Sequence, residues 1–437
     1  MNRKILRLAL PNIISNITVP LMGIVSTAIA GHWGDDSAHT IGALAIGVSI
    51  FNFIYWNCSF LRMGTSGMTA QAFGAGNFEE CTAMLARALT VSAVLGALVL
   101  LLQYPIGEAA LAIMNGDELV SDYFYARIWA VPAGIILFGF NGWFTGMQNA
   151  VIPMFTSITV NTVHIACSLW FAFGCDMGIV GIAYGSVVAQ YTGVALSSVL
   201  LVWRYRKMLT KIDWRRVLDL APMREFFRVN RDIIIRTFCI VSVYTFFTAA
   251  SARMEDEAML AVNTMLLQLF TMFSYMSDGF AYAAEALTGR FIGARDGRSL
   301  RECINKCVVW SVGISVIFVV VYIVWWQDIF GLFLSDSADN SAILASARQY
   351  IGWVIAVSFF SALPFLLDGV MVGATMTRIM RDSLLVSTAA YFAIFYACLP
   401  VIGNNALWLA FTMFMVLRGV AQYFLSKRLK AIYEKAY

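Results

Sequence analysis

Carboxyl groups stand inside long apolar stretches of this chain, where a charge is unfavourable unless it has a partner or a function. Asp278, Tyr282 and Glu285 follow one another at i, i+4 and i+7, so they share one face of a helix over about two turns. A third carboxyl group, Asp368, lies in a later apolar stretch. Burial links the protonation of such groups to conformation, so we predict that Asp278, Glu285 and Asp368 couple ion movement to a structural change. A structural ion pair is the alternative for each acid. The arginines that could pair with Glu285 are Arg62, Arg236 and Arg290.

Of three histidines, only His164 lies within an apolar stretch, and it shares a helix face with Asn161 and Ser168. A buried histidine is usually a neutral hydrogen-bonding group, but it is also the side chain that changes charge near neutral pH. We predict that His164 takes part in cation coupling, with packing as the alternative. Further polar side chains in apolar stretches are predicted to line a substrate cleft: Asn12, Asn16, Ser26, Asn141, Asn161, Ser168 and Tyr282.

The first apolar stretch carries Pro20 in its middle. Proline has no N–H to donate, so it interrupts the hydrogen bonds of a helix and bends its axis. We predict a hinge at Pro20, with a static kink as the alternative. The corresponding stretch of the second half, 232–253, contains no proline, so bending is expected in the first half only.

Cysteine and histidine spacing argues against a metal centre. Cys303 and Cys307 share a helix face, but no histidine or acidic residue completes a tetrahedral set. A membrane-embedded enzyme such as an acyltransferase would need a His–Asp or similar pair at an interface, and no segment of the sequence supplies one. We therefore expect no enzymatic activity and no cofactor.

Twelve apolar stretches carry these residues, and each exceeds the ~20 residues that a helix needs to cross the ~30 Å hydrocarbon layer. They are 5–31, 40–63, 82–107, 121–148, 152–174, 178–203, 232–253, 258–291, 303–326, 345–374, 379–400 and 405–426. The breaks between them alternate between rich and poor in Lys and Arg, so the positive-inside rule predicts that both termini are cytoplasmic. With 60% hydrophobic and 13% charged residues, the composition excludes a sizeable soluble domain, and nothing in it indicates nucleic-acid binding.

The stretches form two halves of six. Their joint is the longest polar segment, 205–230, which is amphipathic and basic and which we call the linker. We predict an N-terminal lobe over 1–204, a cytoplasmic linker that lies in the headgroup layer, and a C-terminal lobe over 231–437.

The two halves repeat in sequence. Gly74 at the end of the second stretch corresponds to Gly293 at the end of the eighth, and Asn141-Gly142 corresponds to Asp368-Gly369. Equivalent helices start on the same side, so the repeat is parallel and implies a cleft between two lobes, as in alternating-access transporters. The predicted fold class is an all-α polytopic membrane protein with twelve transmembrane helices in two pseudo-symmetric six-helix lobes.

Several longer motifs resemble the DinF-like branch of the multidrug and toxic compound extrusion (MATE) transporters. They include Leu8-Ala9-Leu10-Pro11 near the start, FLRMGTSGMTAQA at 60–72, Asp278-Gly279-Phe280-Ala281-Tyr282 and Asp368-Gly369, and the resemblance runs over essentially the whole chain. It implies a V-shaped, two-lobed fold. It also implies a cation-coupled antiporter that exports amphipathic or cationic toxins from prokaryotic cells. As the coupling ion we expect H+ in preference to Na+.

The chain departs from the family pattern in its first half. The family commonly has an acid where this chain has Ser26, and proton-coupled relatives have a second acid at the position of Ser168, close to a family asparagine that is His164 here. Asp368 matches a family acid linked to cation binding in the other lobe. No residue of 237–248 matches the glutamate of sodium-coupled relatives. This pattern favours coupling in the C-terminal lobe.

We therefore predict a monomeric, multi-pass exporter in the inner (plasma) membrane, with small amphipathic or cationic substrates and lipids as its partners. The alternative is a flippase for a lipid-linked saccharide, which a strongly cationic cavity would favour. The cations within the apolar stretches are expected only near the helix ends, which argues against the flippase.

Overall fold

The computed structural model describes residues 1–33, 37–217, 219–253, 257–331 and 339–425. Twelve of the described helical segments are long and apolar enough to cross a membrane, which confirms the predicted number. The described residues form helices and short connections, with no β-strand among them. A helix bonds its own backbone N–H and C=O groups, as a hydrocarbon layer without water requires.

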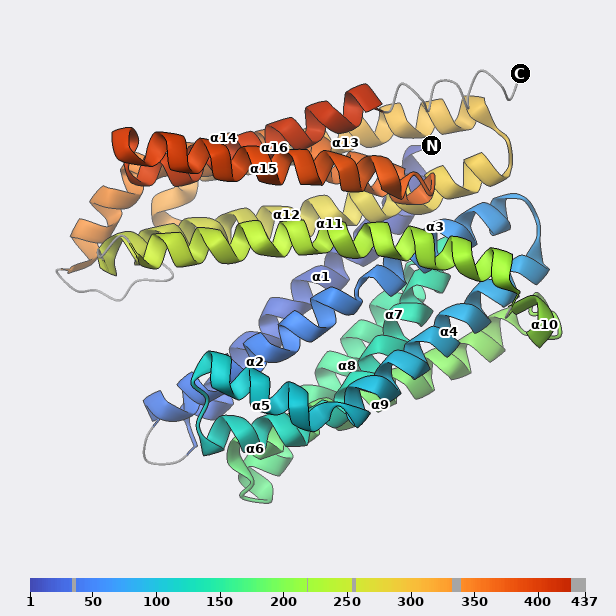
Figure 1. Cartoon of the computed structure of the whole chain (residues 1–437), viewed down its shortest axis with the longest axis horizontal. Coiled ribbons are helices and arrows are strands. Elements are labelled where there is room, and N and C mark those ends of the chain that lie inside the picture. Colours follow the sequence, from blue (N-terminus) through green and yellow to red (C-terminus); the bar gives the residue numbers. More distant parts are fainter. Residues whose placement is uncertain (34–36, 218, 254–256, 332–338, 426–437) are drawn as a thin grey trace. The chain divides into compact units, whose positions relative to one another are not determined.

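The first six spans contain several broken helices (Figure 1). The second span is interrupted at Ser59, the fourth by a 3-10 turn at Ile128–Ala130, and the fifth ends in a π-helical turn at Trp170–Gly174. The helices are α1 (Asn2–Gly31), α2 (Ser37–Cys58), α3 (Phe60–Gly74), α4 (Phe78–Leu101), α5 (Gln103–Met114), α6 (Glu118–Arg127), α7 (Val131–Gly146), α8 (Val151–Leu169), α9 (Gly178–Tyr205) and α10 (Trp214–Val217).

The last six spans are each a single helix. They are α11 (Leu220–Ala252), α12 (Glu257–Gly293), α13 (Gly297–Gly331), α14 (Asp339–Gly373), α15 (Thr377–Ile402) and α16 (Asn404–Leu425). Proline lies inside α14 at Pro364 and inside α15 at Pro400. Proline inside a spanning helix is therefore not confined to the first half of the chain.

The chain divides into two compact units. One, which we call the N-unit, is Leu10–Asn230, and the other, the C-unit, combines Met1–Ala9 with the described part of Arg231–Tyr437. The division falls inside two continuous helices, because α1 contains residues of both units and so does α11. The linker belongs to the N-unit by its contacts.

A hydrogen bond and a cation–π contact hold the first residues of α1 in the C-unit. Trp310 Nε1 donates a hydrogen bond to Asn2 Oδ1 at 3.4 Å, and Lys4 Nζ lies 5.7 Å from the centroid of the Phe291 ring. Ile5 and Ala9 are fully buried. The start of the chain is thus an integral part of the C-unit.

Each unit has an aromatic core of its own. In the N-unit, Phe51 stacks on Phe124 with ring centroids 5.5 Å apart. In the C-unit, Phe247 meets Trp408 edge to face at 4.9 Å. Such pairs add about 0.5–1.5 kcal/mol beyond the burial of their area, which helps to fix the helices of each unit against one another.

The predicted repeat is visible in the backbone. Gly76 and Arg295, 219 positions apart, both follow a helix with left-handed φ angles of 69° and 55°. The next residues are the equivalent N-caps: Asn77 Oδ1 accepts from the Glu80 N–H at 3.0 Å, and Asp296 Oδ1 accepts from the Ser299 N–H at 2.9 Å. Hydrogen bonds from the Ser299 side chain and N–H lower the pKa of Asp296 in this connection outside the spans.

A close helix crossing is also repeated. A Cβ atom on Gly142 of α7 would collide with the carbonyl oxygen of Arg62 in α3, and one on Gly369 of α14 would collide with that of Ala281 in α12. The two glycines are 227 positions apart and the two carbonyls 219 positions apart, so the same crossing is built twice. Glycine at these positions lets two backbones approach, as small residues do in membrane helix pairs.

We expect Gly142→Ala and Gly369→Ala each to destabilise the protein by about 1–3 kcal/mol, because the added methyl group meets backbone that cannot rotate away. Gly313 and Gly352 are matched controls, since nothing lies within 4 Å of a Cβ built at either position. Alanine there should leave stability unchanged or raise it slightly. Thermal unfolding of the purified variants measures the difference, and equal melting temperatures for all four would contradict this account of the crossing.

Candidate functional site

His164 of α8 lies at the centre of a buried set of hydroxyl groups in the N-unit. Its Nε2 is 3.1 Å from Ser26 Oγ of α1. Its Nδ1 is 3.3 Å from Ser186 Oγ of α9 and 3.5 Å from Ser168 Oγ, one helical turn along α8. All four side chains are buried. The structure therefore brings together three residues that the sequence predicted, and it adds Ser186, which the sequence reasoning missed.

A ring of hydroxyl groups can serve either charge state of an imidazole. Neutral histidine needs one donor and one acceptor, whereas protonated histidine donates from both nitrogen atoms. A serine hydroxyl group can donate or accept after a rotation, and Ser186 Oγ also has the Ile182 carbonyl oxygen to donate to, at 3.3 Å. The positive charge of Arg127 acts electrostatically on His164. Arg127 donates a hydrogen bond to the hydroxyl group of Tyr123 on α6.

The same face continues one turn from His164. Asn161 Nδ2 donates a 2.7 Å hydrogen bond to Thr18 Oγ1, which in turn donates to the Ser15 carbonyl oxygen at 2.7 Å. These contacts fix α8 to the segment of α1 that precedes Pro20. In this structure α1 is one continuous helix with Pro11 and Pro20 inside it.

Three other predicted cleft residues of the N-unit lie outside the His164 cluster. Asn12 is buried on α1, and Asn16 is partly exposed one turn further along. Asn141 of α7 is the repeat equivalent of Asp368, and among the described side chains its Oδ1 is a buried atom without a hydrogen-bond partner. A buried amide oxygen in that state is available to a ligand or a water molecule.

In the C-unit, Asp368 of α14 is the centre of an ionic cluster. Its Oδ2 accepts from Arg236 Nε of α11 at 2.8 Å and also from Arg236 Nη2 and from Arg418 Nη2 of α16. Its Oδ1 accepts from Gln422 Nε2 at 2.5 Å. Both carboxylate oxygens are therefore bonded, and Asp368 and Arg418 are buried.

This cluster bears on two expectations. Arg236, one of the arginines that could pair with Glu285, donates to Asp368. The expectation that cations within the spans lie only near helix ends is wrong for Arg236 and Arg418, which stand within α11 and α16. Arg418 was missed, although an arginine inside an apolar stretch is itself a signal for a buried partner.

Asp278, Tyr282 and Glu285 share one face of the unbroken helix α12, as predicted. Glu285 is buried, and its carbonyl oxygen is the atom that a Cβ on Gly373 would strike. Asp278 and Arg418 both act electrostatically on Tyr244 of α11. The acidic face of α12 thus borders the helix that carries Asp368.

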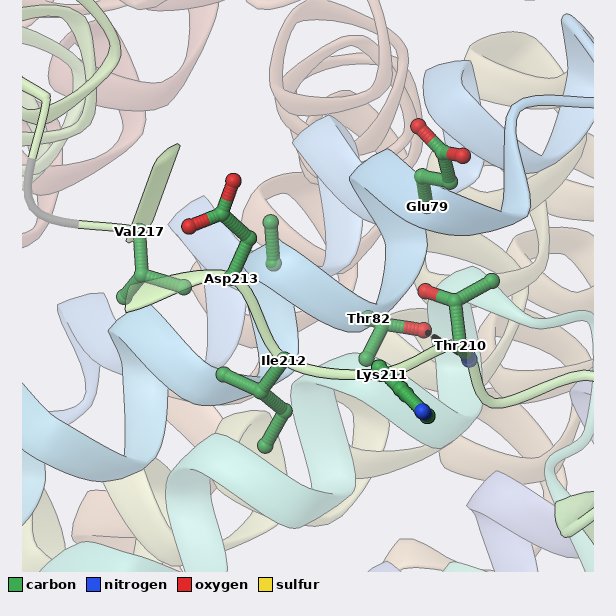
Figure 2. A pocket seen from close by; sticks show the side chains of 8 residues that line it. Glu79, Thr82, Thr210, Lys211, Ile212, Asp213 and Val217 are labelled. Atoms are coloured by element: carbon green, nitrogen blue, oxygen red, sulfur yellow. Dashed lines mark hydrogen bonds between the residues drawn. The ribbon is translucent and has the colours of Figure 1, made fainter. Parts of the chain in front are cut away.

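A cavity lies away from both clusters, at the start of α4. It measures about 260 Å³ and is lined by Glu79, Thr82 and Ala83 and by linker residues 210–213 and Val217 (Figure 2). None of the predicted site residues contributes to it. In the described part of the chain, no group of three or more His, Cys, Asp or Glu residues could hold a metal ion.

Removing the central carboxylate of the ionic cluster should be strongly destabilising. Asp368→Asn leaves two guanidinium groups with only a neutral partner, and breaking a buried pair in this way costs about 3–5 kcal/mol. Arg418→Met should be milder, because Arg236 and Gln422 still satisfy Asp368. Arg378→Gln is the control, since that side chain is 82% exposed. Thermal unfolding checks the order, and an Asp368→Asn variant as stable as Arg378→Gln would overturn it.

Comparisons with known proteins agree with this architecture. The MatE family model matches residues 11–170 and 233–399. The chain is 35% identical over 424 residues to DNA damage-inducible protein F of Escherichia coli, covering 95% of this chain and 89% of that protein. It is 23% identical to the probable multidrug resistance protein NorM of Deinococcus radiodurans, over 96% of this chain and 93% of the relative.

Solved structures share the fold at low identity. A MATE protein crystallised in the bent conformation has a TM-score of 0.88 at 16% identity and covers 100% of this chain and 97% of its own. A mutant of a Vibrio cholerae MATE transporter has a TM-score of 0.85 at 15% identity, over 99% of this chain and 98% of that one. The chain therefore belongs to the multidrug and toxic compound extrusion (MATE) family, and it is a multi-pass membrane transporter and not an enzyme.

Proposed function

We propose that this protein is a proton-coupled antiporter that exports small amphipathic or cationic compounds by alternating access. The family assignment supplies transport, and the relative from Deinococcus radiodurans is named as a probable multidrug resistance protein. The observation that carries the choice of coupling ion is the hydroxyl-ringed His164 in the N-unit. His164 stands beside Ser26 and Ser168. At these two positions this chain has serine where the pattern of proton-coupled relatives has an acid.

Proton coupling at His164 needs no fixed negative charge. When the ring gains a proton, Ser26 turns its hydroxyl hydrogen away and accepts from Nε2, while Ser186 and Ser168 accept from Nδ1. The positive charge that results is buried, so the protonated and neutral states favour different degrees of solvent access. This difference links proton binding to a change between inward-open and outward-open states.

The ionic cluster of the C-unit argues against sodium coupling. A sodium ion at Asp368 would need carboxylate oxygen atoms that Arg236, Arg418 and Gln422 already use. We assign Asp368 a positioning role, with Asp278, Tyr282 and Glu285 on the neighbouring α12 as the groups that would meet a cation or substrate there. A flippase for a lipid-linked saccharide remains the alternative, although Arg236 and Arg418 are both bonded to Asp368.

We further propose that both termini and the linker face the cytoplasm. The protein would reside in the inner (plasma) membrane as a monomer. During transport, lobes 1–204 and 231–437 would move relative to each other. The alternation of basic and acidic breaks supports this orientation. The structure assigns the linker to the N-unit by contacts, which suggests that it moves with the first lobe.

Transport in proteoliposomes tests the proposal directly. We expect efflux of a panel of cationic dyes and bile salts to stop when the proton gradient is collapsed and to continue when the sodium gradient is collapsed. His164→Gln should lower gradient-driven export by about tenfold, the scale of a typical coupling free energy, and should flatten its pH profile. His32→Gln, an exposed control, should change neither. An unaltered pH profile in His164→Gln would remove this residue from the mechanism.

The predicted hinge at Pro20 can be separated from a static kink. Pro20→Ala restores a helical hydrogen-bond donor, so α1 should become stiffer and export slower at normal expression. Pro11→Ala is a matched variant, since Pro11 lies in the same helix next to the boundary between the units. Spin-label distances along α1 during transport report the bending. Identical distance distributions for the parent protein and Pro20→Ala would show that Pro20 is not a hinge.

A further inference from the structure

The net charge of this protein resides in its linker. Segment 205–230 contains seven Lys or Arg and three Asp or Glu residues, a net charge of +4. The whole chain has 30 Lys or Arg and 26 Asp or Glu, also a net charge of +4. The other 411 residues therefore carry 23 basic and 23 acidic side chains and sum to zero. A charge concentrated in this way calls for a partner of opposite sign.

One face of the linker is fixed to the N-unit. The Val217 carbonyl oxygen accepts from Arg87 Nε at 3.0 Å, and Arg87 is fully buried and also bonded to Glu80 at 2.6 Å. The Thr210 N–H donates to Thr82 Oγ1 at 3.3 Å. Phe226, fully buried, belongs to the aromatic core of the N-unit. The linker is thus seated on the start of α4, beside which α10 lies (Figure 1).

Other side chains of the linker are large, apolar and exposed. Trp214 is 56% exposed, Phe227 52% and Leu220 84%. Basic side chains accompany them and are also exposed: Arg206, Lys207, Lys211, Arg215, Arg224 and Arg228. An outward apolar face flanked by arginine and lysine is typical of a segment that lies in a membrane interface.

The ends of the linker place it at the bilayer surface. It follows directly on α9, a membrane span that ends at Tyr205, and it leads into the spanning part of α11. Both ends are therefore tied to the same side of the bilayer by the chain itself. A segment joined at both ends to membrane spans lies closer to lipid headgroups than to any soluble protein or nucleic acid.

We propose that the linker is a binding site for anionic phospholipid headgroups of the surrounding bilayer. The exposed basic side chains pair with the phosphates, and Trp214, Leu220 and Phe227 enter the boundary between headgroups and acyl chains. Since α11 continues without a break from Leu220 to Ala252, a linker held by lipid also holds the first turns of a transmembrane helix. This site goes beyond the transport function and does not depend on the coupling ion.

Native mass spectrometry of the full chain, with equal phosphatidylglycerol and phosphatidylcholine added to the detergent-solubilised protein, tests the proposal. We expect the parent protein to retain phosphatidylglycerol preferentially. The triple variant Lys207→Gln, Arg215→Gln, Arg224→Gln should lower that preference by about tenfold or more, since it removes three of the exposed positive charges that attract anionic headgroups. All three side chains are exposed, so folding should be unaffected.

The matched control neutralises three exposed basic residues on the same predicted side of the membrane, outside the linker: Arg298→Gln, Arg301→Gln and Arg378→Gln. It should keep the lipid preference. A second variant, Trp214→Ser with Phe227→Ser, removes the apolar contact without changing charge and should also weaken lipid retention. Preference retained in the linker triple variant, or lost equally in the control, overturns the proposal.

Discussion

Polar groups inside a hydrocarbon layer must find their partners within the protein, and this constraint shapes the whole structure. Backbone groups meet it by forming helices. Side chains meet it by pairing across helices, as in the hydroxyl ring around His164 and the ionic cluster around Asp368. Close crossings at glycine bring such helices together, and in the His164 cluster a Cβ on Gly185 of α9 would lie 2.8 Å from the backbone nitrogen of Ser168 in α8.

The two units repeat one backbone arrangement but carry different side chains at equivalent positions. The crossing of α3 with α7 and that of α12 with α14 use equivalent glycines and equivalent carbonyl groups. At the same point of this arrangement the N-unit has Asn141 and the C-unit has Asp368. A neutral amide needs no counter-charge, whereas a carboxylate does, and only the C-unit supplies arginines from α11 and α16. Repetition of the backbone therefore leaves the chemistry of each unit free to differ.

The number of spans, their approximate limits and the repeat could be predicted because each depends on local hydropathy or on a short motif. The break at Ser59 and the π-helical turn at Trp170–Gly174 could not, because they depend on packing. The partners of Asp368 lie 132, 50 and 54 residues away along the chain, so no local pattern reveals them. Ser186 is 22 residues from His164 and was missed for the same reason.

The two polar clusters differ in what a change of occupancy requires. If Asp368 binds a proton, it loses the negative charge that balances Arg236 and Arg418, and uncompensated buried charge costs about 3–5 kcal/mol. For His164 to gain a proton, hydroxyl groups rotate about their C–O bonds and each nitrogen keeps a partner in both states, but the new positive charge is buried and Arg127 acts on it. The first arrangement resists change and the second permits it. We therefore propose that the Asp368 cluster keeps the C-unit rigid and that His164 titrates in the N-unit, although the two units repeat the same backbone arrangement.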